Sequence, residues 1–198
     1  MFPVGGVPVM LLGAALSGLL LAALAVLARR RLGPTLAIVL AALAWSLVVV
    51  GLVTLIPAQG APGVVYADAR LPGCSFDVGG PAPQGFWIFG SGQRALNTAL
   101  FVPSGVLVVL LAGALAERAG RSGRLRPRLL AWAVAPLGLV VLVVYSAGIE
   151  LTQLELARLD RACDVTDVID NATGAGLGVA LGLVALGLGA LVRAARRM

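Results

Sequence analysis

Carboxylate and amide side chains gather just ahead of the last apolar segment of this chain. The stretch CDVTDVIDNATGAGLG holds three aspartates and an asparagine, followed by a series of glycines. On a helix with 3.6 residues per turn, residues spaced by four, three and four positions share one face. That spacing relates four polar residues: Asp160, Asp164, Asp167 and Asn171. Asp170 is expected on another face, directed toward water or lipid headgroups.

Two other apolar segments carry polar pairs at the same level. Glu150 and Gln153 stand one turn apart near the end of the fourth apolar segment, and Arg94 and Asn97 stand one turn apart at the start of the third. Neighbouring carboxylates repel one another, so their gathering needs a cation, a shared proton or a nearby arginine. Ionisable residues at membrane depth are functional candidates by default. The predicted polar site consists of Arg94, Asn97, Glu150, Gln153, Asp164, Asp167 and Asn171.

Three roles remain open for these carboxylates. They could coordinate Mg²⁺ or Ca²⁺, with Glu150, Asp164 and Asp167 as candidate ligands. They could share a proton and activate water, as Asp164 with Asp167 or Glu150 with Asp164. They could also serve structure alone, as an interfacial hydrogen-bond network. Histidine and lysine are absent from the sequence, which excludes Ser-His and Ser-Lys dyads, Schiff bases and histidine metal sites.

The elements that must position these side chains are membrane-spanning helices. The chain has 198 residues, of which 60% are hydrophobic and 12% charged, whereas about 25% of a soluble domain is charged. Five apolar runs reach the roughly 20 residues that cross a bilayer. Backbone polar groups in lipid must pair within their own segment, which predicts an all-α transmembrane bundle. The expected spans are 7–28, 36–56, 97–116, 129–150 and 171–192.

The arginines predict how the bundle is oriented. All 15 basic residues are arginine; eleven of them flank one set of segment ends and four the other. The positive-inside rule therefore places the N-terminus outside and the C-terminus inside the bacterial cytoplasmic (inner) membrane. Eight of the nine acidic residues then lie on the outer side, and Glu117 lies inside. The net charge of +6 follows from this topology and indicates no nucleic-acid partner.

The longest non-spanning stretch, 57–95, faces outward in this topology and is rich in glycine and proline. Its GFWIFG motif at 85–90 fits either an interfacial anchor or a lid over a site. Cys74 and Cys163 share the outer, oxidising side, which predicts a disulfide. Two independent thiols are the alternative, because sequence does not give their separation.

Three glycines of the last segment follow a four-residue spacing. Gly174, Gly178 and Gly182 lie on one helical face. Small residues at this spacing let a second helix approach closely, so we expect a tight helix–helix contact there.

Three motifs resemble the VanZ-like family of bacterial membrane proteins: NTALFVPSG at 97–105, IELTQ at 149–153 and CDVTDVIDNATGAGLG at 163–178. The family pattern is an Asn before a Phe-x-Pro-x-Gly turn, then Glu-x-x-Gln, then Asp-x-x-Asp-x-x-x-Asn-x-x-Gly. Two departures stand out, Ser104 in place of an aromatic residue and Asp170 in place of a neutral one. We expect the first to alter the lining of the outer pocket and the second to add negative charge.

The resemblance covers residues 36–192. Residues 1–35 form an additional N-terminal transmembrane helix and cytoplasmic turn, and 193–198 form a basic cytoplasmic tail.

The resemblance implies a protein of the bacterial cell envelope. The founding member of the family is associated with resistance to teicoplanin, a lipid-tailed glycopeptide. The favoured hypothesis is a non-enzymatic protein in the lipid bilayer whose outward acidic site binds an envelope lipid or an amphiphilic antibiotic. No cofactor is required for this role, although a divalent cation is compatible with it.

Two other functions are alternatives to this hypothesis. One is an intramembrane carboxylate-dependent enzyme acting on a lipid-linked or membrane-protein substrate. The other, a transporter, is disfavoured because the acids lie near one surface and no internal repeat is evident.

Overall fold

Five long helices make up the described part of the protein. The computed structural model describes residues 5–56, 73–76, 92–122, 127–155 and 163–196. The helices are α1 (Val7–Leu32), α2 (Pro34–Leu55), α3 (Gly92–Ser122), α4 (Pro127–Glu155) and α5 (Val165–Ala195). Each is long and apolar enough to cross a membrane. The predicted all-α architecture with five spans is therefore confirmed, and the described residues contain no strand beyond an isolated bridge.

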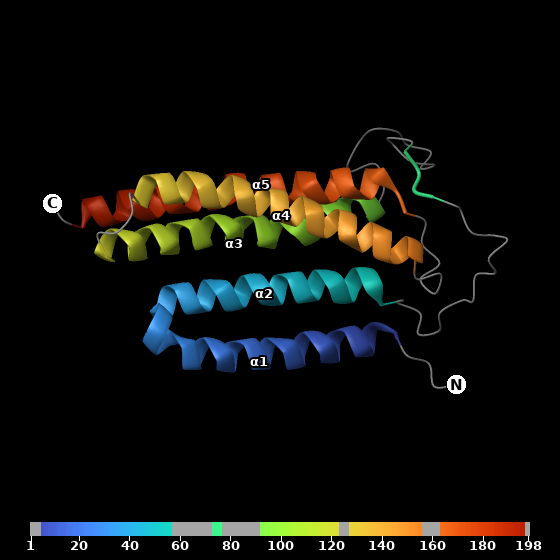
Figure 1. Ribbon diagram of the computed structural model, residues 1–198, viewed down its shortest axis with the longest axis horizontal. Helices are drawn as coiled ribbons and strands as arrows, with labels where there is room; N and C mark the ends of the chain where they lie inside the picture. Colours follow the sequence, from blue (N-terminus) through green and yellow to red (C-terminus); the bar gives the residue numbers. More distant parts are fainter. Residues whose placement is uncertain (1–4, 57–72, 77–91, 123–126, 156–162, 197–198) are drawn as a thin grey trace.

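The helices lie side by side along one axis and alternate in direction (Figure 1). α2 lies between α1 and the group formed by α3, α4 and α5. α1 packs along α2, and the Arg118 side chain of α3 reaches the last turn of α1. Gly33 makes the turn between α1 and α2 with a φ of 85°, a conformation that L side chains rarely adopt. Pro34 follows as the first residue of α2, where its missing N–H costs no hydrogen bond.

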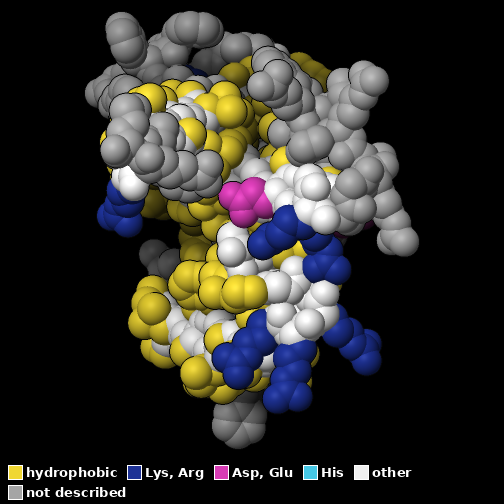
Figure 2. All heavy atoms as spheres, turned by 90° about the vertical axis from the view of Figure 1, so that its left-hand side faces the viewer, with side chains coloured by type: hydrophobic (Ala, Val, Ile, Leu, Met, Phe, Trp, Pro, Cys, Tyr) yellow, Lys and Arg dark blue, Asp and Glu magenta, His cyan; other side chains and the backbone are white. Residues whose placement is uncertain are grey.

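Charge separates the two ends of the bundle. At the end shown in Figure 2, several arginine side chains and one acidic patch are visible among the described residues, with most of the arginines on one side of that patch. We call this the arginine end; its described arginines are Arg29, Arg30, Arg31, Arg118, Arg121 and Arg196. The opposite end, which we call the carboxylate end, carries the starts of α3 and α5 and the last turns of α4 (Figure 1). The positive-inside rule predicts that the arginine end faces the cytoplasm.

The closest contact in the bundle joins α3 and α5. A Cβ built on Gly174 would lie 1.9 Å from the Thr98 carbonyl oxygen, and one built on Gly178 would lie 2.1 Å from the Val102 carbonyl oxygen. Gly182 also faces α3, where its Cβ would meet Val109 at 2.8 Å. Only glycine permits this backbone approach, so the three glycines set the distance between the two helices.

Candidate functional site

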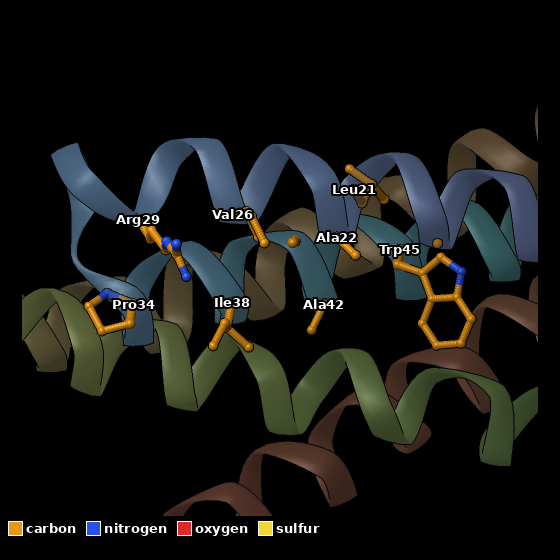
Figure 3. Close-up of a pocket in the computed structure, with 11 residues that line it drawn as sticks. Leu21, Ala22, Val26, Arg29, Pro34, Ile38, Ala42 and Trp45 are labelled. Atoms are coloured by element: carbon orange, nitrogen blue, oxygen red, sulfur yellow. The ribbon is translucent and has the colours of Figure 1, made fainter.

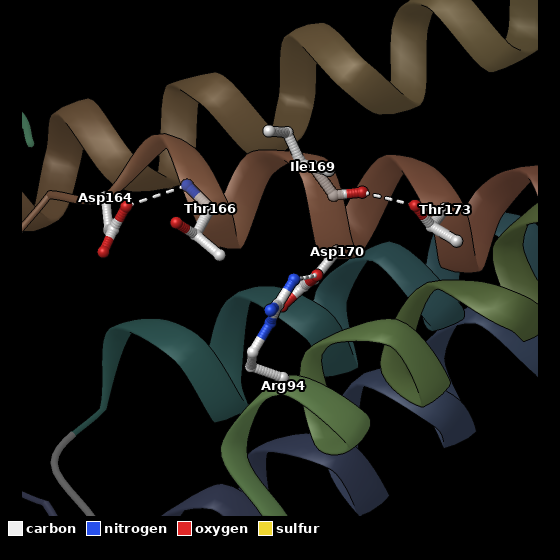
Figure 4. A network of polar contacts seen from close by, with 6 residues as sticks. All are labelled: Arg94, Asp164, Thr166, Ile169, Asp170 and Thr173. Carbon is white, nitrogen blue, oxygen red and sulfur yellow. Dashed lines mark hydrogen bonds and ion pairs between the residues drawn. The ribbon is translucent and has the colours of Figure 1, made fainter. Parts of the chain in front are cut away.

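A buried ion pair links α3 to α5 at the carboxylate end. The Arg94 guanidinium donates two hydrogen bonds to the Asp170 carboxylate, from Nε to Oδ2 at 2.8 Å and from Nη2 to Oδ1 at 2.7 Å (Figure 4). Asp170 is 0% exposed and Arg94 is 7% exposed. The expectation that Asp170 faces water or headgroups is therefore wrong, because its side chain points into the bundle. This bidentate geometry is the strongest form of arginine–carboxylate contact.

The register of α5 explains why Asp170 is buried. Thr166, Asp170 and Gly174 follow one another at intervals of four, and all three are buried. Because successive residues turn by about 100° on a helix, Asp170 lies about 40° from Gly174, whereas Asn171 lies about 60° away on the other side. The glycine face that packs on α3 therefore carries Asp170 into the contact. Asn171 is buried beside it, at 3% exposed.

Asp164 precedes α5 rather than lying on it. The helix begins at Val165, and Asp164 Oδ1 accepts a hydrogen bond from the Thr166 backbone N–H at 2.8 Å. This is the contact of an aspartate that caps a helix N-terminus. The predicted helical stripe through Asp164 is therefore wrong, because the helix starts one residue later. Asp160, its proposed first member, lies outside the described residues.

Two polar residues of α4 tie that helix to its neighbours. Glu150 is buried, and its Oε2 accepts a hydrogen bond from the Asp164 backbone N–H at 3.2 Å. Gln153 is buried one turn later, and its Nε2 donates to the Thr54 carbonyl oxygen of α2 at 2.9 Å. Glu150 thus places a negative charge at the start of α5, where the helix dipole favours one.

Asn171 and Asn97 complete the residues that the sequence predicts here. Asn171 Nδ2 donates to Ser146 Oγ of α4 at 2.9 Å, and Asn97 is 9% exposed in α3, one turn after Arg94. Two buried oxygens, Asn171 Oδ1 and Thr98 Oγ1, have no hydrogen-bond partner among the described residues. An unpaired buried acceptor costs about 1–3 kcal/mol, so this core retains capacity for a donor.

A short outer segment is fastened to the start of α5. Cys74 and Cys163 form a disulfide, as the shared compartment predicted. Next to it, Ser75 N donates to the Cys163 carbonyl at 2.8 Å and Val165 N donates to the Ser75 carbonyl at 3.0 Å. The segment 73–76 is therefore held beside the acidic residues. The GFWIFG motif lies outside the described residues, so its role as anchor or lid stays a prediction.

The structure links part of the predicted set: Arg94 is bonded to Asp170 and attracted by Asp167 and Asp164, and Glu150 accepts a bond from the Asp164 backbone. Asn97 and Gln153 lie one turn after Arg94 and Glu150 on the same helices, and the grouping of all these residues as one site stays a prediction. We call the whole set the polar cluster: Arg94, Asn97, Glu150, Gln153, Asp164, Asp167, Asp170 and Asn171. Its electrostatics centre on Arg94, which attracts Asp170 most strongly and Asp167 and Asp164 more weakly. Asp164 and Asp167 are partly exposed, whereas the other six members are buried.

The carboxylates that the structure describes do not form a three-ligand metal site. No three His, Cys, Asp or Glu side chains among the described residues lie close enough together to hold a metal ion. Two of the three proposed ligands, Glu150 and Asp164, are engaged with backbone groups. Each accepts a hydrogen bond from a backbone N–H near the start of α5.

The family described as VanZ/LLP1 matches residues 46–186. The chain belongs to the VanZ-like family. No curated protein and no solved structure gives a significant match. The matched range of this VanZ-like protein runs from the second half of α2 into α5 and contains the whole polar cluster, whereas α1 lies outside it.

Several polar contacts of the VanZ-like bundle were not anticipated from the sequence. Ser104 is fully buried and hydrogen-bonds Ser46 of α2, so it does not line an outer pocket as expected. Tyr145 of α4 donates to the Leu47 carbonyl at 2.8 Å. Sequence offered no signal for these partners, but the spacing of Asp170 and Gly174 was available and would have made Asp170 a candidate for the inner face alongside Asn171.

Proposed function

We propose that this chain is a non-enzymatic VanZ-like protein of the bacterial cytoplasmic membrane that lowers susceptibility to glycopeptide-type antibiotics. In this proposal the polar cluster divides into two parts. The buried pair of Arg94 and Asp170, together with Glu150, holds the ends of α3, α4 and α5. The partly exposed carboxylates of Asp164 and Asp167 contact a cationic or amphiphilic ligand arriving from outside the membrane.

The observation that carries the proposal is the charge balance of the cluster. Among the described members of the cluster there are one arginine and four carboxylates, and both oxygens of Asp170 are bonded to the arginine. Asp164 and Asp167 keep partial access to solvent beside the disulfide-linked segment. A surface of one sign, set against a low-dielectric wall, concentrates ligands of the opposite charge. A glycopeptide with basic groups and a lipid tail has both features that such a rim would retain.

The same contacts support binding over catalysis. A pair of catalytic carboxylates shares a proton between two carboxyl groups. Glu150 instead contacts the backbone of Asp164, and the Asp164 carboxylate contacts the backbone of Thr166. These are positioning contacts at a helix start, so no specific geometry favours the enzymatic alternative.

Susceptibility testing of charge-neutral variants tests the proposal. The variant combining Asp164→Asn and Asp167→Asn removes two negative charges, and asparagine caps helices as well as aspartate does. Cells expressing it should lose most of the protection against teicoplanin that the wild-type protein confers. Glu155→Gln is the matched control, because Glu155 is an exposed acid at the end of α4 with no role in the cluster.

Membrane abundance and thermal stability of each variant, measured on the same cultures, separate folding from function. Full protection by the double variant at wild-type abundance would overturn the proposal. An equal loss of protection in the Glu155→Gln control would mean that general surface charge, and not Asp164 and Asp167, causes the effect. Turnover of an envelope lipid by the purified wild-type protein would favour the enzymatic alternative over the binding function.

A further inference from the structure

An apolar groove lies between α1 and α2 in the half of the bundle nearer the arginine end (Figure 3). Its volume is about 560 Å³, within the range of protein sites that hold one small ligand. Ala22 and Val26 of α1 face Ile38 and Ala42 of α2 along its length. Apart from Arg29 and Trp45, the residues that line its walls are small or aliphatic.

The groove has the length of one bilayer leaflet. Its lining on α1 runs from Gly18 to Arg29, eleven residue steps that span about 16 Å at 1.5 Å per residue. The hydrocarbon core of a bilayer is about 30 Å thick, so each leaflet contributes about half of that. The groove therefore runs from the headgroup level at Arg29 to the middle of the membrane.

The two ends of the groove differ in chemistry. Toward the membrane centre, the Trp45 ring closes it, held in place by a hydrogen bond from Nε1 to the Ala14 carbonyl at 2.8 Å. Gly18 gives that ring room, since a Cβ there would lie 3.0 Å from Trp45 Nε1. At the other end Arg29 lines the groove, followed by Arg30 and Arg31.

We propose that this groove binds one acyl chain of an anionic phospholipid, with the lipid phosphate held at Arg29. The open apolar groove accommodates the chain up to Trp45, and the guanidinium suits a phosphate through charge-assisted, bidentate hydrogen bonds. Arg118 donates to the carbonyls of Leu32 and Arg31 and so closes the end of α1. Arg29 stays on the groove side of that contact.

This site does not depend on the proposed function. It lies at the opposite end of the bundle from the polar cluster, and Arg29, Gly18 and Ala22 precede the range that matches the VanZ/LLP1 family. The lipid would fill the space between α1 and α2 that side chains leave open, and so fasten the additional helix to the bundle.

Native mass spectrometry of the full-length protein tests the site. The protein is transferred from micelles containing equal amounts of phosphatidylglycerol and phosphatidylcholine, and the retained lipids are counted. We expect one tightly held phosphatidylglycerol per chain. Arg29→Gln should lower the ratio of retained phosphatidylglycerol to phosphatidylcholine about fivefold, the effect of one basic residue near an anionic headgroup. Arg30→Gln, which does not line the groove, should change it less.

Variants that fill the groove with a larger side chain provide a second test of lipid binding. Ala22→Phe places a ring in the groove and should abolish retention, whereas Ala23→Phe adds the same ring to the neighbouring exposed position outside it. Ala42→Phe blocks the groove from the α2 side and repeats the test independently of α1.

Retention unchanged by Ala22→Phe and Ala42→Phe would overturn the site, as would equal loss in Ala23→Phe. Equal retention of both lipids would overturn the role of Arg29. Dimerisation blocked by Ala22→Phe would assign the groove to a second copy of the chain and overturn the lipid.

Discussion

The carboxylate end of α3, α4 and α5 differs sharply from the α1–α2 hairpin. At the carboxylate end, an ion pair and side-chain hydrogen bonds link α3, α4 and α5, and a disulfide fastens the segment 73–76 to the residue before α5. One further bond, from Gln153, reaches the end of α2. In the hairpin, α1 contains no buried residue. Among the described residues, the side chains of Trp45 and Arg118 hydrogen-bond to the backbone of α1.

This difference reflects how helices associate in lipid. Lipid tails are as apolar as leucine, so apolar surface alone provides no net attraction between spans. Close approach at glycine and interhelical polar bonds provide it instead. α3 and α5 possess both, whereas α1 presents leucines around its circumference and relies on two polar contacts. We therefore expect stability to be concentrated at the carboxylate end and tolerance to substitution in α1.

The largest effect is expected at the ion pair. Asp170→Asn removes the carboxylate charge that is paired with the buried Arg94 guanidinium and should destabilise the protein by about 3–5 kcal/mol, the usual cost of breaking a buried pair. Replacing both residues by apolar ones, Arg94→Met with Asp170→Leu, should recover much of this loss, because no uncompensated charge then remains. Thermal unfolding in detergent measures the cycle. Additive losses in the double variant would mean that the two residues do not act as a pair.

The disulfide is expected to contribute next. Cys74 and Cys163 are 89 residues apart, and closing a loop of that length stabilises by about 2–4 kcal/mol. The double Cys→Ser variant should melt at a lower temperature than the oxidised protein. Reductant should lower the melting temperature of the wild type and leave the double variant unchanged. A wild-type protein insensitive to reductant would show that the outer segment adds nothing to stability.

A smaller loss is expected at the glycine contact. Gly174→Ala forces a Cβ toward the Thr98 carbonyl and should cost about 1–3 kcal/mol as α3 and α5 separate. Gly176→Ala is the control on the same helix, because a Cβ there meets no atom within 4 Å. That variant should be neutral or stabilised by up to about 1 kcal/mol through helix propensity. Equal melting temperatures for the two variants would mean that the close approach of α3 and α5 at Gly174 adds no stability.

The smallest effect is expected in α1. Leu19 is 71% exposed and lies outside the groove, so Leu19→Ala exchanges one lipid contact for another. The free energy of unfolding should change by less than about 0.5 kcal/mol. A larger loss of unfolding free energy would mean that Leu19 packs against protein and not only against lipid.

The number and approximate position of the helices were predictable from the sequence, because crossing hydrocarbon requires a long apolar run with internally paired backbone. The glycine spacing predicted a close contact, and the shared side of Cys74 and Cys163 predicted their bond. The polar cluster was predicted as a gathering of Arg94, Glu150 and the aspartates, since each lay at the same end of its segment.

Pairing within that cluster was decided by tertiary structure. Steps of three and of four both return a residue to nearly the same helical face, so spacing alone left Asp170 and Asn171 as rivals for the inner side. The start of α5 at Val165 and its packing on α3 settled the choice. They carried Asp170 to Arg94 and left Asp164 as a cap.

By itself, the sequence determined five spans, a charge difference between their ends and a glycine face, because these depend only on local composition and period. Which carboxylate is neutralised, which helix holds Gln153, and where a groove opens depend on the neighbouring helices. Those answers follow from close packing at glycine and from the cost of leaving buried polar groups unpaired, both of which exist only once the helices meet.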